Sequence, residues 1–278
     1  MEFLKNLDSD LKSALKAQLR DLWTHTSTAI EGNTLTLGET KFVIEEGLTV
    51  SGKPLKDHHE VVGHARAIDL VYAMIGRDEI KATDLFDLHR AVMTQIVIDV
   101  YQPVGGWKKE PNGTYFFNED TNKQDFYEYA TPGDTPALMA KWLKEFNQRN
   151  SAKHSREKAL GAYVALHVSL VNIHPFFDGN GRMARLVSNI PVLKSGHPPI
   201  VIPSERRRDY IDILIKYQLE AGLPKADKKI VLDGKSLDAF KAFCSESWEQ
   251  SLDLVDRARQ RQTSRDKGAE WDATEVLK

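Results

Sequence analysis

Leucines in the first thirty residues recur at intervals of three and four, the spacing that places side chains on one face of a helix. They are Leu4, Leu7, Leu11, Leu15, Leu19 and Leu22. Polar and charged residues fill the positions between them, so the pattern predicts an amphipathic helix packed on a core. Gly32 and Asn33 follow the last periodic residues and predict its end.

Helical periodicity continues through most of the chain and predicts a bundle of helices. The other predicted helices span 37–46, 58–75, Thr83 to about Val97, 137–150, 157–171, Gly181 to about Lys194, 204–221 and 236–261. We expect the last of these to dock on the core, with a dimer contact as the alternative. The polar residues from about Thr263 predict a tail that frays.

The region from Asp99 to Pro136 departs from this pattern, because it is rich in glycine, proline, asparagine and aromatic residues. Two aromatic runs, 115–117 and 126–129, flank a polar turn and predict a β-hairpin. An exposed strand edge can pair with an extended peptide through main-chain hydrogen bonds. The hairpin is therefore either a partner-binding flap near residues 112–131 or a surface hairpin whose aromatic side chains cover the core.

Composition narrows the class of protein. The 278 residues include 38 Lys and Arg against 40 Asp and Glu, a net charge of −2, so no global basic field favours nucleic acid or membrane as a partner. The single cysteine, Cys244, cannot form an intrachain disulfide and favours a reducing compartment. Since the sequence contains neither a bilayer-length apolar run nor a secretory signal, we expect a cytoplasmic protein.

Residues 174–185, His-Pro-Phe-Phe-Asp-Gly-Asn-Gly-Arg-Met-Ala-Arg, combine the residue types that phosphate chemistry requires. We call them the motif segment. A neutral imidazole at His174 can accept the proton of an attacking hydroxyl. The carboxylate of Asp178 can hold Mg²⁺, which usually binds one or two carboxylates together with substrate phosphates. Each residue type is common in loops, but their occurrence together in this order predicts a phosphate-transfer site.

The second half of the motif segment fits an anion. Gly179-Asn180-Gly181 can approach a phosphate closely, because glycine accepts positive φ and has no side chain. Apolar residues resume directly afterwards and predict a helix whose free N–H groups face the bound phosphate. Arg182 and Arg185 are three residues apart, so both can grip a polyphosphate from one side.

The motif segment resembles the signature of the Fic family, His-Pro-Phe-x-(Asp/Glu)-Gly-Asn-Gly-Arg-x-x-Arg, with every specified position present. Most characterised members transfer AMP from ATP to a hydroxyl of a target protein, with Mg²⁺. The resemblance implies an all-α, Fic-type helical bundle with a small β-hairpin flap that positions the target over the active site. It implies a catalytic core at 51–221, after an N-terminal helical region at 1–50 and before a helical extension at 222–278.

The resemblance also assigns roles to single residues of this chain. These are His174 as general base, Asp178 as metal ligand, Gly179, Asn180 and Gly181 as the phosphate cradle, Arg182 and Arg185 on the outer phosphates, and Asn189 at the nucleotide base. Tyr210 also occupies a familiar family position. The intact Gly-Asn-Gly-Arg disfavours the phosphate-transferring Doc branch. ATP, a target protein on the flap and self-modification follow as expected partners and reactions.

Residues 27–33, Ser-Thr-Ala-Ile-Glu-Gly-Asn, resemble the inhibitory motif (Ser/Thr)-x-x-x-Glu-(Gly/Asn) of the same family. This motif begins at Ser27. Glu31 lies near a predicted helix C-terminus, where a carboxylate is disfavoured unless a positive group meets it. Arg185 is the predicted partner, and the pairing would keep that arginine from the γ-phosphate and autoinhibit the enzyme. The alternative is that Glu31 is an ordinary surface acid.

Two other functions stay open. With the same site, the inhibitory carboxylate could position a water and the protein could remove AMP from a modified target. A non-catalytic nucleotide- or partner-binding regulator is the other alternative, although His174 is intact and residues after 221 lack an obvious helix-turn-helix. The cluster of Glu60, His64 and the residues around them is not predicted to bind a metal; Glu60 and His64, four apart, predict a surface pair.

Overall fold

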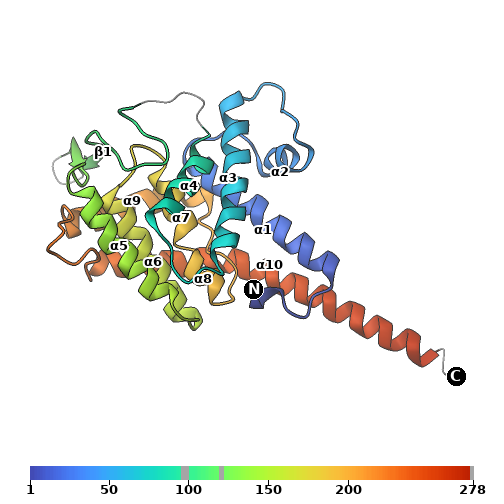
Figure 1. Ribbon diagram of the computed structural model, residues 1–278. Helices are drawn as coiled ribbons and strands as arrows, with labels where there is room; N and C mark the ends of the chain where they lie inside the picture. The colour runs from blue at the N-terminus through green and yellow to red at the C-terminus, as the bar shows by residue number, and fades with distance from the viewer. Residues whose placement is uncertain (95–99, 119–121, 276–278) are drawn as a thin grey trace.

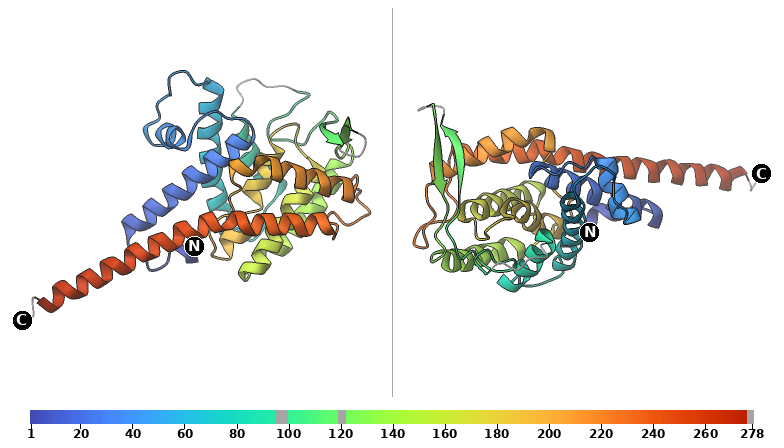
Figure 2. Two further views of the ribbon diagram at one scale, coloured as in Figure 1. Left: turned by 180° about the vertical axis from the view of Figure 1, so that it is seen from behind. Right: turned by 90° about the horizontal axis from the view of Figure 1, so that it is seen from above.

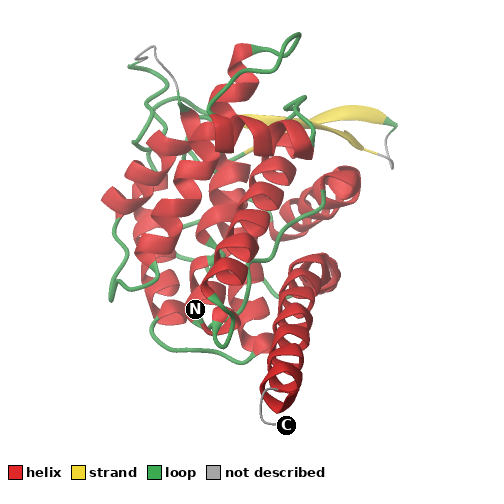
Figure 3. Ribbon diagram, turned by 90° about the vertical axis from the view of Figure 1, so that its right-hand side faces the viewer, coloured by secondary structure: helices red, strands yellow, loops and turns green. Residues whose placement is uncertain are grey.

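Helices make up almost all the regular structure of the described residues, 1–94, 100–118 and 122–275, in this computed structural model (Figure 1 and Figure 3). The helices are α1 (Ser9–Ile30), α2 (Leu37–Glu46), α3 (Leu55–Met74), α4 (Ala82–Met93), α5 (Thr135–Asn150), α6 (Arg156–Ile173), α7 (Asn180–Val187), α8 (Ile190–Lys194), α9 (Arg207–Ala221) and α10 (Lys235–Glu275), with 3₁₀ turns at Glu2–Leu4 and Ser204–Arg206. Strands β1 (Gly113–Asn118) and β2 (Lys123–Glu128) form an antiparallel hairpin. The predicted all-α fold with a small hairpin is confirmed.

Helix α6 is the central rod of the bundle. Its residues from Ala159 to Ile173 are nearly all buried, and α5, α7, α8, α9 and α10 pack against it. The sequence explains this position, because a helix that is apolar around its whole circumference is stable only when other elements surround it. The rod ends at His174, so the core itself sets where the motif segment begins.

The first helix begins later than the leucine pattern predicts. Leu4 lies in a 3₁₀ turn, Asn6 has a left-handed backbone (φ 60°), and α1 begins at Ser9. Leu4 and Leu7 are buried all the same, while the N–H of Phe3 donates to the carbonyl of Gly196 (2.9 Å). The leucine spacing thus predicts which side chains are buried. It does not predict the helix start, because Asn6 adopts the left-handed conformation, which asparagine tolerates, and no helix runs through this position.

The three largest other differences from prediction concern α4, the helix after Gly181 and α10. Helix α4 ends at Met93, where Thr94 turns left-handed (φ 45°), and Val97 lies outside the described residues. The single helix expected after Gly181 is two, α7 and α8, since Pro191 lacks the N–H that a continuous helix needs. Helix α10 continues past Thr263, where fraying was predicted.

Contacts to the start of α1 hold α10 as far as Arg265. Arg265 binds the carboxylate of Asp10 with two nitrogens, at 2.9 and 2.7 Å, and the side chain of Gln262 accepts the N–H of Asp8 (2.7 Å). The far end of α10 extends beyond the body, on the side opposite to the hairpin (Figure 2).

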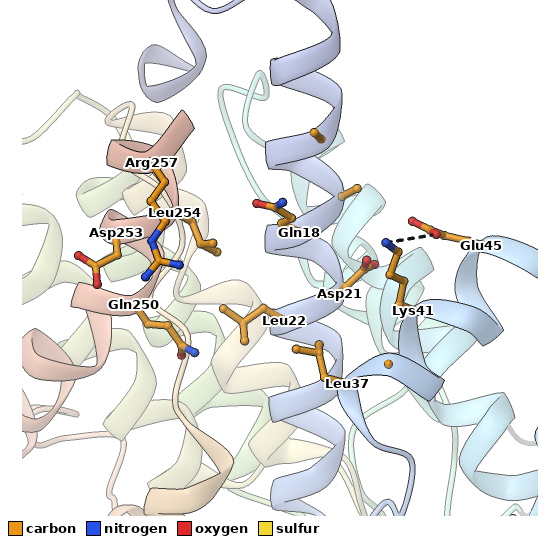
Figure 4. A pocket seen from close by; sticks show the side chains of 13 residues that line it. Gln18, Asp21, Leu22, Leu37, Lys41, Glu45, Gln250, Asp253, Leu254 and Arg257 are labelled. Carbon is orange, nitrogen blue, oxygen red and sulfur yellow. Dashed lines mark ion pairs between the residues drawn. The ribbon is translucent and has the colours of Figure 1, made fainter. Parts of the chain in front are cut away.

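The inner half of α10 packs on α1, α6 and α9, which confirms the predicted docking on the core. A groove runs between α1, α2 and α10, with Leu22, Leu37 and Leu254 among its lining residues (Figure 4). This groove lies apart from the motif segment, and the dimer contact stays a prediction. Within the described ranges, no helix has both the length and the apolar character to cross a membrane.

Candidate active site

His174 stands at the C-terminal cap of α6 with a left-handed backbone (φ 54°), which is uncommon for a residue other than glycine. This conformation turns the chain from the rod into the loop that leads to α7. The ring Nδ1 lies 3.1 Å from the carbonyl oxygen of Val171. Because a carbonyl only accepts, Nδ1 carries the proton and Nε2 keeps a lone pair, as a general base requires.

The surroundings of His174 favour its neutral form. Burial lowers the pKa of His174 to about 3; the charge of Lys108 adds to this, whereas the Val171 carbonyl and Glu31 oppose it. One face of the imidazole is covered by Tyr129, whose ring is parallel to it with centroids 3.7 Å apart. The imidazole is therefore neutral at neutral pH, with its one proton on Nδ1.

The carbonyl groups of the loop after His174 are bound to the scaffold. The main-chain N–H of Lys108 donates to Pro175 (2.9 Å), and the Asn112 amide donates to Phe176 (2.9 Å) and Phe177 (3.3 Å). The next carbonyl, that of Asp178, lies 3.0 Å from Nε2 of His89. Four consecutive carbonyl oxygens are thus engaged, which fixes the loop that precedes α7.

His89 is neutral and holds the loop before α7 by a hydrogen bond from one of its ring nitrogens. Its Nδ1 accepts the N–H of Gly105 (2.9 Å), so the proton is on Nε2 and is donated to the carbonyl of Asp178. The ring stacks on Phe176 (centroids 4.0 Å apart), and burial lowers the pKa of His89 to about 4. Nothing in the amphipathic pattern of α4 distinguishes this histidine from an ordinary core residue.

The first turn of α7 already holds an anionic group. Gly179 (φ 79°) caps the helix, and a Cβ on Gly181 would lie 2.8 Å from Oε1 of Glu31 and 3.1 Å from Nη1 of Arg185. The Glu31 carboxylate therefore lies beside Gly181 in the first turn of α7, next to the helix N-terminus where the sequence predicts a phosphate. Free N–H groups and the helix dipole attract an anion to this place.

Arg185 is almost completely buried and is bound by the N-terminal helix. Its Nη2 donates to Glu31 Oε1 (2.6 Å) and to the main-chain oxygen of Ser27 (2.9 Å), and its Nε donates to the Ser27 hydroxyl (2.9 Å). The predicted ion pair is present. Burial opposes ionisation of Glu31, but Arg185, with smaller effects of Arg182 and Arg207, outweighs it and lowers the pKa of Glu31.

Asp178 and Arg182 lie beside this pair. The Asp178 carboxylate is about two-thirds exposed (65%), accepts the N–H of Gly179 (2.6 Å) and lies 3.5 Å from Nη2 of Arg182. On its other side Arg182 approaches Glu60 at 4.0 Å. The described residues contain no cluster of three or more His, Cys, Asp or Glu side chains able to hold a metal ion, so a metal here would depend on Asp178 and on ligands brought with it.

The side chains of three residues that the family resemblance singles out form hydrogen bonds with other residues of the chain. The Asn180 amide clips both the N–H and the carbonyl of Phe176 (2.9 and 2.8 Å). Asn189 is fully buried, donates to the carbonyls of Arg185 and Ile200 and accepts the N–H of Ile200, so its contact with a nucleotide base stays a prediction. The Tyr210 hydroxyl accepts from Arg185 (3.3 Å) and lies 2.9 Å from His167.

The predicted surface pair of Glu60 and His64 is wrong. His64 is 1% exposed, and burial together with the charges of Arg185 and Arg182 depresses its pKa far below the usual value. Glu60 instead accepts from Asn33 (3.1 Å), which also donates to the carbonyl of Asp57 (3.0 Å). These contacts seat the loop after α1.

Arg207 holds the last carbonyl of α1, because its Nε donates to Ile30 (2.6 Å). The residue that follows Ile30 is Glu31, so this bond from α9 and those between Asn33 and α3 fix the segment that carries Glu31. Neither the contact of Arg207 nor those of Asn33 could be predicted from the sequence, because the residues that form them lie far apart along the chain.

Comparison with known proteins agrees with the family resemblance of the motif segment. Residues 79–191 match the Fic/DOC family model. The protein adenylyltransferases Fic of Drosophila ananassae and Drosophila melanogaster are 31% and 30% identical to the chain over 230 residues, 82% of its length. The chain spans about 40% of the length of these curated relatives.

Solved structures share the fold. A Fic domain containing signaling protein from Bacteroides thetaiotaomicron superposes with a TM-score of 0.75 at 26% identity, over 91% of this chain and 92% of that one. Fic-1 from C. elegans (TM-score 0.69, 24% identity, 95% of this chain and 69% of that one) shares the fold alone. With the intact motif segment at the end of α6, these matches show that the chain belongs to the Fic/DOC family.

Proposed function

We propose that this chain is a protein adenylyltransferase that transfers AMP from ATP to a Tyr, Thr or Ser hydroxyl of a target protein. The curated relatives bear that name. One observation carries the proposal for the chain itself: a neutral imidazole, with its proton on Nδ1 and a lone pair on Nε2, lies at one end of a short loop, and at the other end is a helix N-terminus with a carboxylate beside its first turn. These are the base and the anion site that the transfer needs.

The proposed reaction uses these groups in one displacement. The phosphates of ATP lie over the N-terminus of α7, with Arg182 and Arg185 on the outer phosphates. The target hydroxyl attacks the α-phosphorus and gives its proton to Nε2 of His174. A new oxygen–phosphorus bond forms, the bond to the bridging oxygen breaks, and pyrophosphate leaves. Positioning and fixed positive charge supply most of the acceleration in such transfers.

Asp178 fits the role of the metal ligand. Its carboxylate is mostly exposed at the start of α7, and Mg²⁺ in nucleotide sites commonly binds one protein carboxylate and completes its shell with phosphates and water. When bound, Mg²⁺ would neutralise part of the negative charge of the phosphates.

Autoinhibition is part of the proposal. Glu31 engages the guanidinium of Arg185 and lies over the turn at Gly181, so it competes with an outer phosphate for both. ATP could then bind only in a pose that does not present its α-phosphorus to the hydroxyl. The single, buried thiol of Cys244 fits a cytoplasmic location, which we include in the proposal.

The pH dependence of the transfer is a direct test of the base. Because burial lowers the pKa of His174 to about 3, the neutral form persists as the pH falls. We expect kcat of an activated variant, Glu31→Gly, to stay free of a protonation step of His174 between about pH 8 and about pH 6. Initial rates across this range measure it, and an inflection near the usual histidine pKa that disappears with His174 would contradict it.

The nucleotide is tested by intact-mass analysis. The Glu31→Gly chain is incubated with ATP, GTP, UTP or CTP and Mg²⁺, and self-modification serves as the readout. We expect a mass increase of one AMP with ATP, absent from the Glu31→Gly, His174→Ala double variant. If no nucleotide gives His174-dependent labelling of the chain or of added proteins, the proposed function is wrong.

A second reaction at this site is favoured by one observation. The Glu31 side chain is ionised and still 38% exposed, so it could orient a water beside the imidazole. Removal of AMP from a modified target is the corresponding activity. Incubating the unchanged chain and Glu31→Gly with an AMP-modified protein distinguishes the two, since only the unchanged chain should release AMP.

A further inference from the structure

The hairpin joins the body through two residues that also touch the motif segment. Asn112 directly precedes β1 and Tyr129 directly follows β2, and the Tyr129 N–H donates to the Asn112 carbonyl (3.1 Å), which closes the base of the hairpin. We call these two residues the flap root. Beyond the root, the hairpin projects from the side of the body (Figure 2).

The side chain of Asn112 is fixed at both ends. Its Oδ1 accepts from the ammonium of Lys108 (2.6 Å), and its Nδ2 donates to the carbonyls of Phe176 and Phe177. Lys108 is only 2% exposed, and its own N–H holds the carbonyl of Pro175. The Asn112 amide therefore has a fixed orientation and binds the motif segment at Phe176 and Phe177.

Tyr129 fixes the imidazole of His174 in a second direction. The hydrogen bond to Val171 sets where Nδ1 points, but the ring could still rock about that bond. The Tyr129 ring, 7% exposed and inclined by only 1° to the imidazole, blocks this motion on one face.

We propose that the flap root is a positioning device for His174: Asn112 holds the loop that follows the imidazole, and Tyr129 holds the plane of its ring. The inference rests on the proposed function and adds two residues to it. Neither residue touches the reacting atoms; each acts through the loop or the ring that it holds. Proton transfer needs donor and acceptor within about 3 Å, and a displacement of about 1 Å can reduce a rate about 100-fold.

The outer part of the hairpin has different contacts. Tyr115, Phe117 and Phe126 are 68%, 62% and 52% exposed, and the rings of Tyr115 and Phe126 lie 4.9 Å apart across the two strands. These side chains face solvent, whereas the flap root faces the motif segment. Substitutions in the two parts should therefore affect different kinetic constants.

The test compares Tyr129→Leu, Tyr129→Phe and Asn112→Asp in the Glu31→Gly chain. Tyr129→Leu removes the ring, and Asn112→Asp keeps the acceptor for Lys108 but removes the donor to the two carbonyls. We expect each to lower kcat by about 10- to 100-fold with little change in KM for ATP. Tyr129→Phe keeps the ring and should recover most of the parent rate. Tyr72→Leu removes a partly buried tyrosine of α3 that packs on the core, and controls for loss of packing.

A second measurement needs no activity. For this measurement the Tyr129 variants are made with Glu31 retained, and the NMR resonances of the His174 ring are assigned by their loss in His174→Ala. These resonances should shift in Tyr129→Leu but little in Tyr129→Phe. The titration midpoint of His174 should rise in Tyr129→Leu, because water reaches the ring. The proposal fails if Tyr129→Leu and Asn112→Asp keep kcat within about twofold of the parent, or if Tyr72→Leu loses as much. Absence of any transfer by Glu31→Gly refutes the proposed function, while the resonances still decide whether Tyr129 holds the ring.

Discussion

Glu31→Gly is expected to raise the initial rate of AMP incorporation by about 10- to 100-fold at equal ATP and Mg²⁺. A hydrogen bond to a charged group contributes about 1.5–3 kcal/mol, and each 1.4 kcal/mol is about tenfold in rate. The substitution removes the carboxylate from Nη2 of Arg185 and from the turn at Gly181, so an outer phosphate finds both unoccupied. Radiolabel transfer from ATP to the chain measures the rate.

The matched control is Glu46→Gly, because Glu46 is the exposed last residue of α2 and also precedes a glycine. It should label like the unchanged chain. Glu31→Gly also leaves the buried Arg185 without its carboxylate, so we expect a lower Tm that ATP restores more strongly than in the unchanged chain. Equal labelling by Glu31→Gly and the unchanged chain would contradict autoinhibition.

His174→Ala, introduced into Glu31→Gly, is expected to lower the transfer rate by about 10²- to 10⁴-fold, the usual contribution of a positioned general base. The remaining groups, Arg182, Arg185 and the α7 N-terminus, are unchanged, so ATP should bind with nearly the same Kd. Single-turnover rates and calorimetric titration with ATP separate the chemical step from binding.

His59→Ala serves as the control, since His59 is an exposed histidine at the start of α3. It should keep the rate of Glu31→Gly. A His174→Ala rate within tenfold of its parent would show that another group takes the proton. If the chain binds ATP yet shows no His174-dependent transfer at all, the regulator alternative gains support.

The chemistry of the motif segment could be predicted from the sequence, but the contacts that orient it could not. Histidine, carboxylate, glycines and arginines are adjacent along the chain, so their types and order carry the information. Asn112, Tyr129 and His89 reach the loop only through the tertiary fold. In the sequence Asn112 resembles a turn residue before glycine and Tyr129 resembles the end of a strand.

The ion pair between Glu31 and Arg185 was predicted from two sources together. A carboxylate at a helix C-terminus needs a positive partner, and the resemblance of residues 27–33 to the family's inhibitory motif makes Arg185, 154 positions away, the candidate. The helix boundaries were less predictable. Leu4 and Leu7 keep the period of α1 although the chain is not helical there, because the same core surface buries them.

The end of α6 has a consequence for how this protein can change. His174 terminates α6, in which residues 162–173 are all buried and against which α5, α7, α8, α9 and α10 pack. Interiors packed like crystals transmit even the loss of a methylene group. Replacing Leu166 or Leu170 by a smaller residue would therefore shift the imidazole without touching any reactant. Substitutions that preserve turnover should therefore be found on the outer helices, whereas the buried side chains of α6 should keep nearly the same total volume.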